Sequence, residues 1–157
     1  MKKIGLIGFV IVAVFIAIGL KTALNTGVKS PIWAEGKIVL DPQLKDHGSK
    51  LTTLYLVIYD LDSPRPMPYG AMRERLAENE FADGVYDFRI TKEKLQIMGG
   101  GMGDSGGDHH PTNLRVKARL DFDGVAGVDQ PGDVTGEVSP VPFGKSDLTI
   151  TIDKLIE

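Results

Sequence analysis

A glycine-rich segment carries most of the side chains in this chain that could bind a transition metal. Met98, Met102, His109 and His110 supply thioether and imidazole groups, and the glycines between them would let the backbone fold around an ion. This combination of ligands matches copper best. Ligand-type residues also occur often in loops that bind nothing, so a solvated loop without a cofactor is the first prediction. A copper site is the alternative.

A second candidate is the tripeptide Pro66, Met67 and Pro68. The two prolines fix their own φ angles and hold Met67 extended, which would present a rigid apolar side chain to a partner protein. The same tripeptide could be a stiff loop that closes the domain, and this interpretation is the favoured one, since proline is common in turns.

The chain contains no recognisable catalytic motif. There is no G-x-S-x-G, H-E-x-x-H, phosphate-binding loop or dinucleotide fingerprint. The absence of cysteine excludes disulfides, thiolate nucleophiles and cysteine-based metal sites. We therefore predict a binding or assembly protein rather than an enzyme.

The charge balance argues against nucleic acid as a partner. The whole chain carries a formal charge of −3, and the 14 Lys or Arg against 20 Asp or Glu that follow Glu35 give that part −6. Phosphate binding needs clustered basic residues interleaved with aromatic ones, and the sequence shows no such run.

The N-terminal segment predicts a membrane anchor. Residues 4–20 contain no charged or polar side chain, and they follow Lys2 and Lys3. A helix over residues 1–23 would approach the roughly 30 Å of a hydrocarbon core. The lysines favour a cytoplasmic N-terminus, which predicts a single-pass protein of the bacterial inner membrane with a periplasmic C-terminal domain. A cleaved signal peptide is the alternative.

The rest of the chain predicts a mainly β domain. Residues 24–35 are expected to be a linker, and residues 36–157 contain short runs of branched and aromatic residues between Gly, Pro, Asp and Asn. Expected strands cover residues 37–40, 51–59, 85–90, 114–122 and 148–152. The pattern favours an antiparallel β-sandwich or barrel-like domain.

One segment is ambiguous between helix and strand. Residues 68–80 show helical spacing after Pro68, although Gly70 opposes a helix. The spacing alone therefore leaves a helix over residues 68–80 as an open interpretation.

Charged residues on the expected strands could pair across the sheet. Candidates for such pairs are Arg73, Arg115 and Arg119 with Asp87, Asp121 or Asp133. Pairs of this kind on a solvated face stabilise little. The sequence therefore gives no reason to assign them a site.

An ordered set of motifs resembles a known family. The motifs are Gly36-Lys-Ile-Val-Leu-Asp-Pro-Gln-Leu44, Pro66-Met-Pro-Tyr-Gly-Ala-Met-Arg73, Leu114-Arg-Val-Lys-Ala-Arg-Leu120 and Pro131-Gly-Asp-Val-Thr-Gly136. Together they resemble the C-terminal periplasmic domain of the cytochrome c maturation protein family CcmI/CycH. The resemblance implies a β-sandwich-like periplasmic domain that works with the machinery delivering apocytochrome c for haem attachment. It also implies that the chain continues as a strand after Pro68, so we favour a strand over residues 69–72 and leave the remainder of residues 68–80 open.

The chain also departs from that family. Its members carry two membrane helices and a tetratricopeptide array that grips the apocytochrome, whereas here one apolar segment leads directly to the β domain. We therefore expect an accessory protein of cytochrome c maturation, or a small accessory subunit of a respiratory complex containing a c-type cytochrome, acting by protein contacts. Its expected partners are membrane proteins of those systems and the lipid bilayer. A periplasmic copper-binding or copper-delivery protein is the alternative.

Overall fold

The computed structural model describes residues 30–48, 50–64, 67–78, 80–98 and 111–157. The anchor predicted over residues 1–23 lies outside these ranges, and within them no helix is long and apolar enough to cross a membrane. Residues 31–157 form one compact unit. This unit is mainly β, as the sequence predicts.

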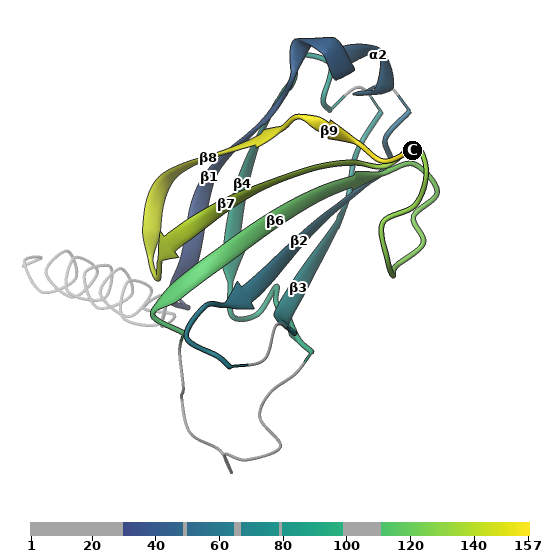
Figure 1. Ribbon diagram of the computed structural model, residues 1–157. Coiled ribbons are helices and arrows are strands. Elements are labelled where there is room, and N and C mark those ends of the chain that lie inside the picture. The colour runs from purple at the N-terminus through teal and green to yellow at the C-terminus, as the bar shows by residue number, and fades with distance from the viewer. Residues whose placement is uncertain (1–29, 49, 65–66, 79, 99–110) are drawn as a thin grey trace, which may run out of the picture. The chain divides into compact units, whose positions relative to one another are not determined.

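Two sheets make up the domain (Figure 1). The three-stranded sheet has the order β4-β1-β8, and the six-stranded sheet has the order β5-β3-β2-β6-β7-β9. The elements are β1 (Ile32–Leu40), the 3-10 turn η1 (Pro42–Leu44), α2 (Lys45–Gly48), β2 (Thr53–Asp60), β3 (Pro68–Arg75), β4 (Val85–Thr91), β5 (Gln96–Ile97), β6 (Asn113–Asp121), β7 (Val134–Pro142), β8 (Lys145–Ile152) and β9 (Lys154–Leu155).

Strand pairing is antiparallel with one exception. β1 and β8 run parallel, so the prediction of antiparallel sheets is corrected at this pair. The reason is topological: the short turn between β7 and β8 carries the chain from the six-stranded to the three-stranded sheet, where β8 runs in the same direction as β1.

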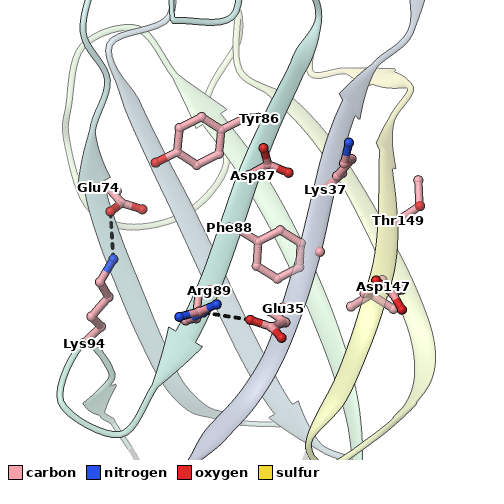
Figure 2. Close-up of a pocket in the computed structure, with 12 residues that line it drawn as sticks. Glu35, Lys37, Glu74, Tyr86, Asp87, Phe88, Arg89, Lys94, Asp147 and Thr149 are labelled. Carbon is pink, nitrogen blue, oxygen red and sulfur yellow. Dashed lines mark hydrogen bonds and ion pairs between the residues drawn. The ribbon is translucent and has the colours of Figure 1, made fainter. Parts of the chain in front are cut away.

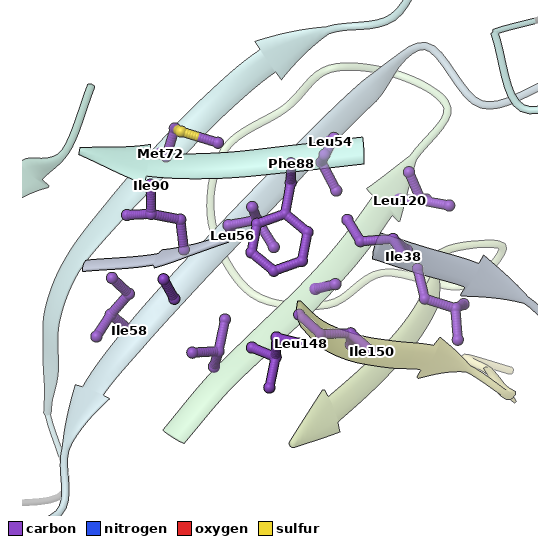
Figure 3. Close-up of a cluster of buried hydrophobic side chains, with 14 of the residues drawn as sticks. Ile38, Leu54, Leu56, Ile58, Met72, Phe88, Ile90, Leu120, Leu148 and Ile150 are labelled. Carbon is purple, nitrogen blue, oxygen red and sulfur yellow. The ribbon is translucent and has the colours of Figure 1, made fainter. Parts of the chain in front are cut away.

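The core lies between the two sheets and follows the alternation of the strands (Figure 3). Leu54, Leu56 and Ile58 of β2 are fully buried, and they face Ile38 of β1 and Ile150 of β8 across the interior. Each such side chain stabilises the fold by about 1.5–3 kcal/mol relative to exposure. The period-2 pattern therefore determines which residues form the core.

β1 begins at Ile32, inside the linker predicted over residues 24–35. Trp33 is 1% exposed and packs against Tyr69 and Phe143, with ring centroids 5.3 and 5.2 Å away. The linker predicted over residues 24–35 therefore extends too far, because Trp33 is a core residue. Residues 32–35 belong to the β domain.

β3 occupies Pro68–Arg75, so the helical interpretation of residues 68–80 is wrong and the strand prediction for residues 69–72 is confirmed. Pairing with β2 from Pro68 opposite Tyr59 to Arg75 opposite Thr53 overrides the helical spacing. Gly70 fits this role, because an added Cβ there would lie 2.9 Å from Leu95 Cγ. Pairing with residues distant in sequence sets the conformation of β3, and the spacing of residues 68–80 does not indicate that pairing.

Two glycines allow the strands to approach closely on one side of the sandwich. A Cβ added at Gly136 of β7 would lie 1.9 Å from the Thr151 oxygen of β8, and one at Gly36 of β1 would lie 1.9 Å from the Leu148 oxygen. No side chain fits at such distances. The Gly136 contact brings β7 and β8 together, and the Gly36 contact brings β1 and β8 together within one sheet. The side between β4 and β3 is open and contains a groove.

Candidate functional site

The predicted metal ligands fall mostly outside the described residues. Met102, His109 and His110 lie there, and Met98 is described, directly after β5, with 63% of its surface exposed. Within the described ranges no group of three or more His, Asp or Glu side chains could hold a metal ion. The copper site therefore stays a prediction.

The predicted partner-binding tripeptide is described in part. Pro66 lies outside the described residues, Met67 is 59% exposed, and Pro68 is the first residue of β3. An exposed methionine next to a strand start fits both a rigid apolar contact and a stiff loop. The role of this tripeptide stays a prediction.

Arg119 of β6 is the centre of a buried ionic cluster. Its side chain is 5% exposed, and its Nη2 lies 3.3 Å from Asp121 Oδ2 while its Nε lies 3.7 Å from Asp133 Oδ2. Both carboxylates are only 1% exposed. Asp129 adds a longer contact, 3.9 Å from Nη1. Three acidic residues thus surround one guanidinium.

The same guanidinium holds the backbone of the β6–β7 loop (residues 122–133). Arg119 Nη1 donates to the Gly127 carbonyl at 2.9 Å, and Nη2 donates to the Val125 carbonyl at 3.1 Å. Its Cζ also lies 4.6 Å from the centroid of the Tyr55 ring. Planar geometry and five donors let arginine join these partners at once, which lysine could not do.

Tyr55 and Arg73 fix the beginning of this loop at Gly124. The Tyr55 hydroxyl donates to the Gly124 carbonyl at 3.0 Å, and Arg73 Nη2 donates to the same oxygen at 3.1 Å. Gly124 has φ +74°, a conformation that glycine adopts without strain. Its N–H donates to Asp121 Oδ1, so the cluster and the turn form one unit.

Asp121 and Asp133 close the loop at its two ends. Asp133 Oδ2 accepts from the Gln130 N–H at 2.9 Å, and the Asp133 N–H donates to the Gln130 carbonyl at 3.0 Å. Burial raises the pKa of Asp121 above its ordinary value, opposed by the hydrogen bond from Gly124 and reinforced by the charge of Asp133. The loop conformation is therefore maintained by buried charges.

Apolar side chains on this fixed loop face solvent. Phe122, Val125 and Val128 are 45%, 50% and 81% exposed. In Figure 1 the loop lies beside the C-terminus, where Gly132 N–H donates to the Ile156 carbonyl at 2.8 Å. The structure thus combines an immobilised backbone with an apolar outer surface.

A charged groove runs along the open side of the sandwich (Figure 2). It has a volume of about 750 Å³, and its lining includes outward side chains of the three-stranded sheet together with Glu74 of β3 and Lys94. Arg89 Nε lies 2.7 Å from Glu35 Oε2, and Lys94 Nζ lies 3.1 Å from Glu74 Oε1. These groups are solvated, unlike those around Arg119.

Tyr86 connects the two sheets at this groove. Its ring stacks on Phe81 with centroids 5.5 Å apart. Burial raises the pKa of the Tyr86 hydroxyl, and its hydrogen bond to the Glu74 carboxylate raises it further. The lining of the groove therefore includes the stacked Tyr86 ring as well as charged side chains.

Sequence reasoning found part of this arrangement. The predicted pairing of Arg119 with Asp121 and Asp133 is confirmed, but its placement on a solvated face is wrong, because the β6–β7 loop covers it. Asp87 lies in the other sheet and pairs with none of those arginines. The missed signal is the dense set of Asp and Gly between residues 121 and 133, a composition that builds hydrogen-bonded turns.

Comparison of the chain with protein-family models, with curated proteins and with solved structures gave no match. The resemblance to the CcmI/CycH family therefore rests on the sequence motifs alone.

Proposed function

We propose that this protein is a non-catalytic accessory protein that binds another protein through the β6–β7 loop. The observation that carries the proposal is the combination of a backbone fixed by Arg119 with the exposed side chains of Phe122, Val125 and Val128.

Rigidity is the physical reason to choose this loop. Association costs free energy when a flexible segment must be ordered, and a loop already held by hydrogen bonds from Arg119, Tyr55 and Arg73 avoids most of that cost. Single exposed apolar residues are normal on a protein surface. Three of them on one hydrogen-bonded loop make a candidate contact surface, because removing apolar area from water favours association.

The partner class follows from the sequence. The predicted anchor would hold the domain at the periplasmic face of a bacterial inner membrane, and the CcmI/CycH resemblance favours membrane proteins of cytochrome c maturation or of a respiratory complex containing a c-type cytochrome. The protein acts there either as an assembly factor or as a permanent small subunit. Constant stoichiometry on purification distinguishes the subunit from the factor.

The test is a pull-down of the full-length chain from its native membrane in a mild detergent, followed by mass spectrometry and a haem stain. Val125→Asp/Val128→Asp should lose the partner, because charges would enter an apolar contact. Leu61→Asp is the matched control, since Leu61 is 43% exposed on the loop after β2 and should keep the partner.

Loss of haem-attachment proteins or cytochrome subunits only in the β6–β7 loop variant supports the proposal. Recovery of the same partners by both variants contradicts the assigned surface. Recovery of no partner at all by the unaltered chain contradicts the function itself.

A further inference from the structure

The edge of β4 is free on the open side of the sandwich. β4 is the outer strand of the three-stranded sheet, and no described strand pairs with it on the side away from β1. Free edges are templates for pairing with another chain, and proteins usually block them with charged side chains. On β4 the exposed charged residues are Asp87 and Arg89.

The register with β1 shows which backbone groups are free. The Leu40 N–H donates to the Gly84 carbonyl at 2.8 Å, and antiparallel partners alternate between bonded and non-bonded pairs. The same alternation holds along the paired residues of β1 and β4. The backbone N–H and carbonyl groups that point away from β1 are therefore those of Val85, Asp87 and Arg89. Three consecutive pairing positions are thus available at the edge.

We propose that this edge binds β4 of a second copy of the chain, antiparallel, about a two-fold axis through Phe88. In this register all seven residues of β4 pair. Val85 lies opposite Thr91, Tyr86 lies opposite Ile90, and Phe88 lies opposite its own copy. Asp87 of each copy lies opposite Arg89 of the other, so both outward charge pairs are attractive.

The neighbouring symmetric registers are repulsive. Moving the axis to residue 87 places Asp87 opposite Asp87 of the second copy, and moving it to residue 89 places Arg89 opposite Arg89. Like charges directly opposite one another destabilise a strand pair. The charges of β4 therefore disfavour these two neighbouring registers, and the register through Phe88 pairs the full strand.

The adjacent strand extends the complementarity. Within one copy Glu35 lies opposite Arg89, 2.7 Å between Oε2 and Nε, and Lys37 lies opposite Asp87. Pairing of two copies gives a row across the joined sheet of Glu35, Arg89, then Asp87 and Lys37 of the second copy. The charges alternate along that row (the residues of one copy are shown in Figure 2).

The first test reverses the charges in the full-length chain and measures association by analytical ultracentrifugation in a mild detergent. Asp87→Arg alone and Arg89→Asp alone place like charges opposite each other, and each should weaken dimerisation at least about tenfold. Asp87→Arg/Arg89→Asp together restore opposite charges between the copies and should recover dimerisation relative to either single change, though not fully, because Glu35 and Lys37 of the same copy then lie opposite like charges. A monomeric unaltered chain, or dimers that survive both single changes, would overturn the proposal.

The second test is independent of charge and of folding losses in those variants. Because the chain has no cysteine, Asp87→Cys and Arg89→Cys can be made separately in two differently tagged chains and mixed before oxidation with diamide. A disulfide should form between the two variants and not within either population alone, since only residues 87 and 89 lie opposite each other. Equal cross-linking in the separate populations, or none in the mixture, contradicts this register. The edge of β4 is distinct from the β6–β7 loop, so either proposal can fail while the other holds.

Discussion

The Arg119 cluster and the β4 groove use the same residue types in opposite environments. Around Arg119 the guanidinium and two carboxylates are at most 5% exposed, whereas at the groove Arg89 is 62% and Lys94 51% exposed. Buried charges cost several kcal/mol each to desolvate and are tolerated only when paired, while exposed pairs are worth about 0–1 kcal/mol.

The difference indicates two roles for charge in this domain. Arg119 is the main cation that fixes the β6–β7 loop, since it donates to the Gly127 and Val125 carbonyls and pairs with both buried carboxylates. Arg73 and Lys117 add contacts to the Gly124 carbonyl and to Asp129. Arg89 contributes little to folding, and its charge remains available to another molecule. Substitutions in the two regions should therefore differ in how much they destabilise the domain and in how strongly that loss depends on salt.

The largest effect is expected for Arg119→Ala. It leaves Asp121 and Asp133 buried without their cation and should destabilise the domain by about 3–5 kcal/mol. Arg119→Lys is the matched control, because it retains the charge but lacks the planar guanidinium. Its stability should lie between those of the unaltered chain and Arg119→Ala. Denaturant unfolding of the full-length chain measures both, and a loss below about 1 kcal/mol for Arg119→Ala would contradict a buried cluster.

Asp121 should give the domain a pH-dependent stability of defined sign. Its folded-state pKa is raised above the ordinary 3.8, so its contribution is full below that pH and is lost as the pH rises through the raised value. Asp121→Asn removes this titration and keeps an acceptor for Gly124. The stability of the variant relative to the unaltered chain should therefore improve as the pH is raised from about 4 to 7. A constant difference across that range would show that the pKa is not raised.

Tyr86 should produce the corresponding effect at high pH. Its pKa is raised above the ordinary 10.0, so stability is lost as the pH rises above that value. Absorbance titration should show two of the four tyrosines, Tyr69 and Tyr86, ionising later than a free tyrosine, and Tyr86→Phe should remove the later of these two steps. Persistence of the later step would assign it to another residue, of which Tyr69 is the candidate since burial also raises its pKa.

Most strands of the domain were predictable because their faces differ in polarity. The alternation along residues 114–122 places Leu114 and Val116 inward, as β6 confirms. The parallel pairing of β1 with β8 was not predictable, since it depends on the chain crossing from one sheet to the other between β7 and β8. β3 was ambiguous for a similar reason, because its pairing with β2 and β5 cannot be inferred from the spacing of its own apolar residues.

The candidate sites were less predictable than the fold. Arg119 occupies an outward position on β6, where alternation indicates solvent, and it is buried only because the β6–β7 loop folds over it. Sequence gives the loop composition but not its path. The edge of β4 likewise requires the strand order, which shows that no described strand covers it.

The smallest effect is expected at the groove, and it completes the comparison. Glu35→Gln removes the charge opposite Arg89 without changing β4 itself, and it should reduce stability by at most about 1 kcal/mol because the pair is solvated. About 1 M salt should abolish that difference, since screening acts over roughly 3 Å at this ionic strength. The Arg119→Ala loss should persist in the same salt, because its partners are shielded from solvent. Denaturant unfolding of both variants at low and high salt measures this contrast. A salt-insensitive loss of about 2 kcal/mol for Glu35→Gln would show that the Glu35–Arg89 pair is shielded from solvent like the Arg119 cluster.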